Sequence, residues 1–151
     1  MAANSRFAIA VHILTLLARY AERPVKSDFL AQSVNTNPVV IRRLLCTLAQ
    51  AGLVASQTGA AGGSWLARPA AQISLNEVYR AVEAGHSLAL PRRKANAECP
   101  VGRHIEDVLT DVIRETERAC ERVLAQVTIA QVLRTVGPCG MPREEEFNVI
   151  L

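Results

Sequence analysis

The chain has 151 residues, half of them hydrophobic, enough for one compact domain with an appendage or for a single domain that dimerises. Its formal net charge of +3 is distributed unevenly. Residues 1–70 hold seven Lys and Arg against two acidic residues, a net charge of +5, and the remainder holds ten against twelve, a net charge of −2. A basic N-terminal half favours a polyanionic partner for that half.

The apolar stretch at 7–17 is interrupted by His12, has no signal-peptide cleavage site and is too short to span a bilayer. We therefore expect a cytoplasmic protein with no membrane partner and with reduced cysteines. We expect no metal site or cofactor, because the histidines are scattered and no CxxC pair is formed by Cys46, Cys99, Cys120 or Cys139. The sequence has no Ser/His/Asp order, no phosphate loop and no paired carboxylates outside the helix surface runs, so an enzyme is not expected.

Hydrophobic periodicity predicts two helices and a turn in the first part of the chain. The first helix covers residues 7–20 with Ser5 as its N-cap, and the second is short and takes Ser27 as its N-cap. In the turn that follows, Asn35 can adopt a left-handed conformation and Asn37 can cap the next helix.

A third predicted helix, over residues 38–50, has two contrasting faces. Pro38 suits its first position, and Gly52 ends it. At about 100° per residue, one side carries Ile41, Leu44, Leu45 and Leu48, and the opposite side carries Val39, Arg42, Arg43, Cys46 and Gln50. Arginines near the start of such a helix suit a DNA major groove; a solvated surface is the alternative.

The pattern of a β-hairpin follows the third helix. Strand-like segments at 53–57 and 64–67 flank a glycine-rich tip at 58–63. The order helix, helix, turn, helix and hairpin is that of a winged helix-turn-helix, in which the glycines allow the backbone to approach DNA. The predicted DNA-contacting residues are Ser5, Arg6, Ser27, Asn37, Val39, Val40, Arg42, Arg43, Gly59, Gly62 and Gly63. A frayed terminus and a simple turn are the alternatives for the first two residues and for the glycines.

The second half predicts further helices, so the fold class is mainly α with a small β wing. A helix over 75–84 is followed by a non-periodic loop at 85–100, which contains Pro91-Arg92-Arg93-Lys94. The longest helix covers about 101–126, and a last short helix ends near 134. The two short helices begin at the N-caps Ser74 and Thr128. The long helix bears one apolar stripe, formed by Ile105, Val108, Leu109, Val112, Ile113, Cys120, Val123 and Leu124.

Six segments between residues 5 and 133 form a specific combination. They are Ser5-Arg-Phe-Ala-Ile-Ala-Val11, the helix-turn-helix at 27–53, Gly59-Ala-Ala-Gly-Gly63, Ile73-Ser-Leu-Asn-Glu-Val78, Cys99-Pro-Val-Gly102 and Thr128-Ile-Ala. The combination resembles the Rrf2 family of bacterial winged-helix regulators, which includes iron–sulfur and nitric-oxide sensing members. The resemblance implies a homodimer joined through the stripe of the long helix, with two wings and two third helices facing a palindromic operator in double-stranded DNA.

The resemblance also implies a division of the chain. We predict a winged helix-turn-helix domain at 1–84, a loop at 85–100, dimerisation helices at 101–136 and a tail at 137–151 that we expect to be flexible.

The chain departs from the family pattern at two places. Cluster-binding members have three cysteines in the loop and on the first turn of the long helix, whereas this chain has only Cys99 there. Because an iron–sulfur cluster needs several thiolates, this chain cannot build the three-cysteine site. Its Cys99-Pro-Val-Gly102 segment resembles the cluster-free branch of the family. The wing has Thr58 and Ser64 where the family often has an arginine and an aromatic residue, so the wing has no arginine for the minor groove.

Cys99 is a candidate redox sensor. A helix N-terminus lowers the pKa of a thiol, and Arg103 and His104 lie within one turn. The alternative is a cysteine packed against a neighbour, which is also the interpretation of Cys120 as a core residue. The sequence does not specify whether the effector is a redox signal or a small molecule.

The sequence thus predicts a sequence-specific DNA-binding transcriptional regulator. We expect a repressor that binds a palindromic operator as a homodimer without an iron–sulfur cluster. The alternative is a dimeric protein-interaction or thiol-redox sensor module in which DNA binding is weak or lost.

Overall fold

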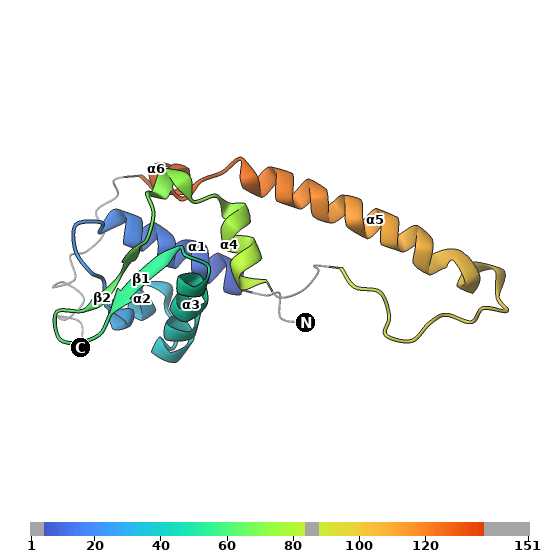
Figure 1. Cartoon of the computed structure of the whole chain (residues 1–151), viewed down its shortest axis with the longest axis horizontal. Coiled ribbons are helices and arrows are strands. Elements are labelled where there is room, and N and C mark those ends of the chain that lie inside the picture. The colour runs from blue at the N-terminus through green and yellow to red at the C-terminus, as the bar shows by residue number, and fades with distance from the viewer. Residues whose placement is uncertain (1–4, 84–87, 138–151) are drawn as a thin grey trace.

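A computed structural model describes residues 5–83 and 88–137, which form a winged domain with a long arm (Figure 1). The elements are α1 (Arg6–Arg19), α2 (Ser27–Val34), α3 (Pro38–Gln50), β1 (Val54–Gln57), β2 (Gly63–Leu66), η1 (Ala70–Gln72), α4 (Leu75–Val82), α5 (Pro100–Ala125) and α6 (Ile129–Val136). The two strands form an antiparallel hairpin, so the predicted fold class is confirmed. Residues 84–87 and the predicted tail from 138 onward, with Cys139, lie outside the described residues.

The turn before α3 has the predicted local structure. Asn35 adopts a left-handed conformation with φ 58°, and the side chain of Asn37 accepts a hydrogen bond from the backbone N–H of Val39 at 2.8 Å. Two predicted N-caps differ. Ser5 has helical backbone angles and its side chain makes no capping bond. The N-cap position of α2 is Lys26, so Ser27 is the first helical residue, and its hydroxyl accepts a hydrogen bond from Arg42 instead.

The core of the winged domain lies where α1, α2, α3 and α4 meet the base of the hairpin. Its largest fully buried side chains are Ile13, Leu14, Leu17, Leu30, Ile41, Leu48, Leu53, Ile73, Val78, Val82 and Ile129. They come from elements spread along most of the chain, so the core fixes the relative positions of the helix-turn-helix and the wing.

The last of these core residues shows that α6 belongs to the winged domain. Ile129 is fully buried, and its backbone N–H donates to the carbonyl of Ile73 at 2.9 Å. Leu75 donates in the same way to Val127 at 2.8 Å. From the sequence, α6 was predicted to be one of the dimerisation helices at 101–136. In the folded chain it lies against α1 (Figure 1).

The arm consists of α5 and the loop that leads to it. None of the 26 residues of α5 is buried. The helix contacts α4 at its C-terminal end, where the guanidinium of Arg80 pairs with the carboxylate of Glu121 at 2.9 Å. Much of its predicted apolar stripe stays in solvent along the single chain: Val108, Val112 and Val123 are 58%, 56% and 63% exposed, whereas Ile105, Ile113 and Leu124 are half-buried. Cys120, predicted to be a core residue, is exposed as well.

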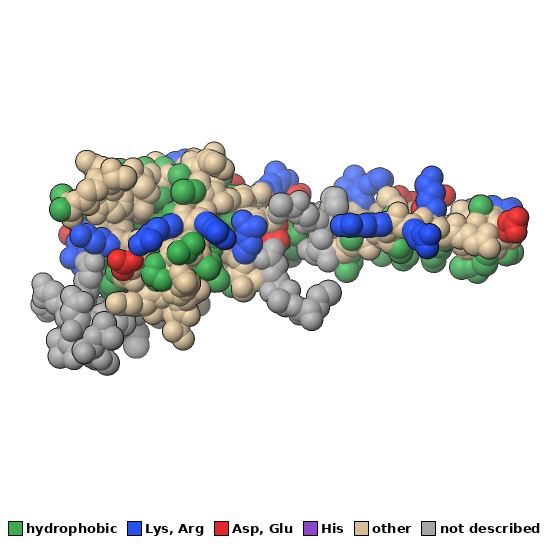
Figure 2. All heavy atoms as spheres, turned by 90° about the horizontal axis from the view of Figure 1, so that it is seen from below, with side chains coloured by type: hydrophobic (Ala, Val, Ile, Leu, Met, Phe, Trp, Pro, Cys, Tyr) green, Lys and Arg blue, Asp and Glu red, His purple; other side chains and the backbone are tan. Residues whose placement is uncertain are grey.

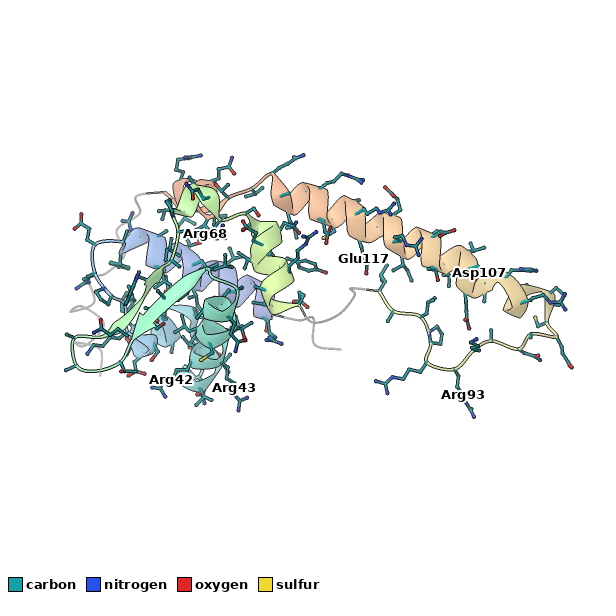
Figure 3. All side chains as sticks on the ribbon, in the orientation of Figure 1. Arg42, Arg43, Arg68, Arg93, Asp107 and Glu117 are labelled. Carbon is teal, nitrogen blue, oxygen red and sulfur yellow. The ribbon has the colours of Figure 1, made fainter. Side chains whose placement is uncertain are left out.

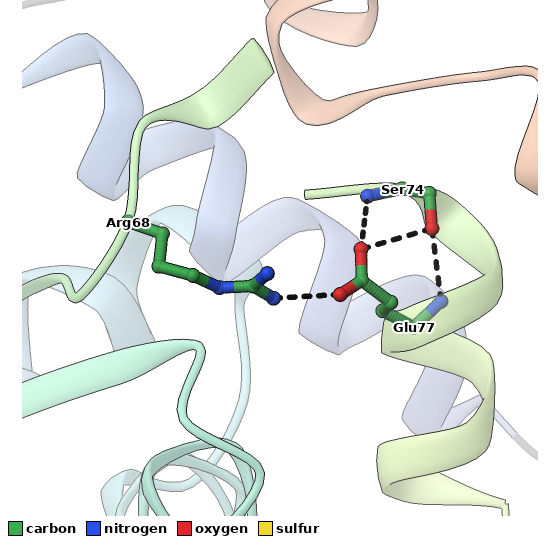
Figure 4. Close-up of polar contacts among 3 residues, drawn as sticks. All are labelled: Arg68, Ser74 and Glu77. Atoms are coloured by element: carbon green, nitrogen blue, oxygen red, sulfur yellow. Dashed lines mark hydrogen bonds and ion pairs between the residues drawn. The ribbon is translucent and has the colours of Figure 1, made fainter. Parts of the chain in front are cut away.

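A capping box at the start of α4 joins the chain after the wing to the helical core (Figure 4). The carboxylate of Glu77 accepts a hydrogen bond from the backbone N–H of Ser74 at 2.9 Å and one from Arg68 at 2.7 Å. The Ser74 N–H, followed by the Arg68 guanidinium, lowers the pKa of this carboxyl. Because Arg68 lies two residues after β2, the contact connects the base of the wing to α4.

We predict that Glu77→Gln lowers the free energy of unfolding by about 0.5–1 kcal/mol at neutral pH, since it removes a charge-assisted bond that solvent partly screens. The pKa of the folded carboxyl lies below its ordinary value of 4.5. Its stabilisation is therefore complete above that value and is lost as the pH falls through the folded pKa.

Urea unfolding at a series of pH values checks this. The difference between wild type and Glu77→Gln should shrink in acid, whereas Glu98→Gln, a change of an exposed carboxylate on the arm, should have little effect throughout. A difference of the same size at every pH would show that the charge of Glu77 contributes nothing.

Candidate nucleic-acid interface

Helix α3 divides sharply into a buried and an exposed side. Its four buried residues are those predicted, Ile41, Leu44, Leu45 and Leu48. The predicted opposite side, formed by Val39, Arg42, Arg43, Cys46 and Gln50, is exposed throughout. Burial of one side against the core fixes the rotation of the helix about its axis, so the other side must face outward.

The two arginines of α3 lie at the lower end of the winged domain in Figure 3. Arg42 donates from Nε to the Ser27 hydroxyl at 3.3 Å and from a terminal nitrogen to the Asp28 carboxylate at 3.2 Å. The guanidinium of Arg43 makes no hydrogen bond or ion pair with any residue that the structure describes. The Arg42–Asp28 pair was not anticipated, because nothing local in the sequence indicates a contact between residues 14 positions apart.

This ion pair is weak, since its side chains are 59% and 70% exposed. Exposed pairs of this kind contribute about 0.2–1 kcal/mol. Arg42 is therefore ordered by α2 but can be released to a better anionic partner at small cost. Arg43 can bind such a partner without breaking any described contact.

Two valines accompany the arginines at the start of α3. Val39 and Val40 are 47% and 37% exposed, although both are hydrophobic and the core lies on the other side of the helix. They follow Asn37, whose side chain is engaged in capping α3. An exposed apolar pair beside two cations is suited to a surface that is both anionic and locally apolar, such as the methyl groups of thymine among phosphates.

The wing glycines have internal structural roles. A Cβ on Gly62, which is buried, would collide with the backbone carbonyl of Gln57. A Cβ on Gly63 would lie 2.8 Å from the carbonyl oxygen of Val25. Val25 and Ser64 exchange backbone hydrogen bonds at 2.8 and 2.9 Å, so the hairpin is attached along β2 to the segment before α2. The tip positions 58–61 are exposed, and so are Ser56 and Gln57 at the end of β1.

A row of Lys and Arg side chains crosses the face of the winged domain that bears α3 and continues onto the arm (Figure 2). Ser5 and Arg6, predicted to contact DNA, are exposed at the start of α1. The structure thus places Arg42 and Arg43 of α3 on this basic face. No helix within residues 5–83 and 88–137 is long and apolar enough to cross a membrane.

Cys99 occupies the N-cap position of α5 and is exposed rather than packed against a neighbour. The backbone N–H groups of Gly102 and Val101 lower the pKa of its thiol. No group of three or more His, Cys, Asp or Glu side chains with metal-binding geometry occurs in the described part of the chain. The residues of the loop therefore do not fit an iron–sulfur cluster, which requires several thiolates.

The fold and its basic face define a winged helix-turn-helix DNA-binding protein of the transcriptional-regulator class. Residues 3–135 match the Rrf2 family, described as iron-dependent transcriptional regulators. YwnA of Bacillus subtilis strain 168, which is named as an HTH-type transcriptional regulator, is 40% identical to this chain over 130 residues. The match covers 86% of this chain and 96% of YwnA. YwgB of the same strain, named likewise, is 31% identical over 129 residues, 85% of this chain and 81% of YwgB. The chain belongs to the Rrf2 family.

Solved structures agree in fold. A transcriptional regulator from Lactobacillus plantarum superimposes with a TM-score of 0.75 at 26% identity and covers 96% of this chain and 98% of its own. IscR of T. potens gives a TM-score of 0.69 at 24% identity over 97% and 96% of the two chains. The matching family and the relatives YwnA and YwgB are transcriptional regulators, so the chain is a regulator rather than an enzyme.

We predict that Cys99 is alkylated by iodoacetamide at lower pH in the folded protein than in the urea-unfolded chain. The thiolate is the reacting form, and the two backbone N–H groups stabilise it only in the folded state. Mass spectrometry of the Cys99 peptide over a pH series gives both midpoints. Equal midpoints, or a higher one in the folded protein, would contradict the prediction.

Proposed function

We propose that the protein is a sequence-specific repressor that binds a palindromic operator as a homodimer, without an iron–sulfur cluster, in the cytoplasm. The observation that supports this most directly is the exposed side of α3. It presents Arg42 and Arg43 beside Val39 and Val40, and the two arginines lie at the lower end of the winged domain (Figure 3).

The arginines and valines on this side of α3 have suitable partners in DNA. The guanidinium of Arg43 can pair with O6 and N7 of guanine or bind phosphate, and the valines can contact thymine methyl groups. Arg42 exchanges the Asp28 carboxylate for a phosphate or a base edge. The tip of the wing, Thr58–Ala61, lies beside the groove and offers backbone N–H groups to phosphates. Base contacts by α3 would give specificity, and the wing would add affinity.

The exposed stripe of α5 supports the homodimer. A helix of 26 residues without a buried side chain leaves a contiguous apolar surface in water, which a soluble monomer rarely tolerates. In Figure 2, where the basic face is toward the viewer, hydrophobic side chains gather along one edge of the arm. A second copy packed against that edge about a two-fold axis leaves both basic faces on the same side of the dimer.

The length of α5 agrees with an operator read by two copies. Twenty-six residues span about 39 Å. Two antiparallel α5 helices would hold the winged domains at opposite ends, at a separation comparable to one turn of DNA, about 34 Å. The two α3 helices can then enter successive major grooves on one face of the duplex. A dimer bound in this way over a promoter excludes RNA polymerase, which is the basis for proposing repression.

We predict that Arg42→Ala combined with Arg43→Ala abolishes operator binding and leaves the dimer intact. Each arginine accounts for about 1–3 kcal/mol in a base or phosphate contact, so the affinity should fall by at least roughly thirtyfold. Fluorescence anisotropy with a duplex of the protein's own promoter region measures this.

The control changes two exposed arginines outside α3, Arg118 on α5 and Arg134 on α6, to alanine. It removes the same charge as the Arg42/Arg43 variant but leaves α3 unchanged, so it should bind as the wild type does. If the Arg42/Arg43 variant retained wild-type affinity, α3 would not be the reading helix.

We predict that Val112→Glu converts the dimer into a monomer, since Val112 lies near the middle of α5 and would meet the same region of a second copy. Sedimentation velocity measures the change. Ala125→Glu, on the opposite side of the helix, is the matched control and should remain dimeric. A dimeric Val112→Glu protein would assign the interface to another surface.

A further inference from the structure

The loop before α5 carries a cluster of three consecutive cations, Arg92, Arg93 and Lys94. All three are exposed, and Glu98 is the only acidic residue in the described part of this loop, 88–99. None of the three makes a hydrogen bond or ion pair with any of the described residues. The interactions of α3 and of the winged domain described above do not involve this cluster.

Hydrogen bonds on the C-terminal side of the cluster hold the loop against α5. After the cluster, the backbone N–H of Ala95 donates to the carboxylate of Glu106 at 2.9 Å, and Arg103 donates to the carbonyl of Ala97 at 3.1 Å. Before the cluster, Leu88 and Leu90 line a hollow together with Ile113 of α5.

Glycine at position 102 is required for this packing, because a Cβ there would collide with the carbonyl of Asn96. The cluster is therefore displayed on an anchored loop, and less conformational entropy is lost when it binds a partner than if the segment were free.

The cluster lies on the same side of the molecule as the reading helix. In Figure 3, Arg93 projects from the underside of the loop, and Arg42 and Arg43 lie at the lower end of α3. Figure 2 shows the corresponding row of basic side chains, which runs from the winged domain onto the arm. The apolar stripe occupies an edge of the arm instead, so the cluster can remain accessible when α5 is paired.

We propose that Arg92, Arg93 and Lys94 bind backbone phosphates of the same duplex that α3 reads, as a second contact on each subunit. The inference rests on the proposed function and adds to it a partner for the loop. Guanidinium and ammonium groups without acidic partners match phosphate in charge. Such contacts position the protein on DNA and carry no sequence information of their own.

The contact also has a defined place on the DNA. The loop runs beside the middle and N-terminal part of α5, away from the winged domain of its own chain (Figure 1). In the antiparallel dimer this part of the arm lies between the two winged domains. The cluster therefore meets phosphates between the two half-sites, where α3 makes no contact.

Salt titration of DNA binding tests the proposal. The variant Arg92→Gln, Arg93→Gln, Lys94→Gln is compared with the wild type on a duplex of the protein's own promoter region. Each lost phosphate contact should reduce the slope of log affinity against log salt by about 0.9, equivalent to roughly eightfold in affinity at about 0.1 M salt. The matched control removes three arginines elsewhere, Arg19→Gln, Arg118→Gln and Arg134→Gln, and should keep the wild-type slope.

Footprinting locates the contact. In the loop variant, hydroxyl-radical protection should disappear between the half-sites, and methylation protection of bases in the two half-sites should remain. An unchanged slope, or a slope reduced equally in the control, overturns the inference. A loop variant that becomes monomeric in sedimentation also overturns it, because the cluster would then bind the second subunit.

Wild-type protein that binds neither the promoter duplex nor a random duplex would instead overturn the proposed function, and with it this contact. The loop variant changes only exposed side chains, so its circular dichroism should match the wild type.

Discussion

The burial of one side of α3 is the constraint on which the reading surface depends. Ile41, Leu44, Leu45 and Leu48 are held in the core, and burial of each such side chain contributes about 1.5–3 kcal/mol. No rotation of the helix could expose any of them without losing a large part of the stability of a small domain. The arginines and valines on the other side therefore face outward for reasons of packing, whatever they bind. The wing depends on the same core, because β2 is bonded to Val25 and the chain after it is joined to α4 through Arg68.

Local signals in the sequence were sufficient for the helix-turn-helix. The left-handed Asn35, the cap at Asn37 and Pro38 act within a few residues of one another, and α3 has the predicted bounds of 38–50. Ser74 and Thr128 were correctly identified as caps for the same reason: each forms a box with the residue three positions later. Two predicted capping signals failed, at Ser5 and Ser27, and the second of them has a distant partner. The hydroxyl of Ser27 is bonded to Arg42, 15 residues away.

Features that depend on tertiary packing could not be read from the sequence. The Arg42–Asp28 pair exists because α2 and α3 cross at their N-terminal ends, and no spacing rule specifies that crossing. Likewise, α6 has the amphipathic pattern of any surface helix, and its place beside α1 follows from the backbone bonds between residues 73–75 and 127–129. Cys120 was predicted to lie in a core because it is on the apolar stripe of α5. It is exposed in the single chain because that stripe has no partner within the chain.

Asp28 sets a limit on how strongly the basic face attracts DNA. It places a negative charge beside Arg42 on the surface proposed to meet phosphates, which weakens non-specific attraction there. The ion pair is worth little in water, so a base edge or phosphate in the right position can displace the carboxylate, whereas a loosely placed phosphate gains less from doing so. Arg43 and the loop cations have no such competitor among the described residues. Asp28 would thus make the contact of Arg42 depend more strongly on the exact position of its DNA partner than the contacts of Arg43 and the loop cations.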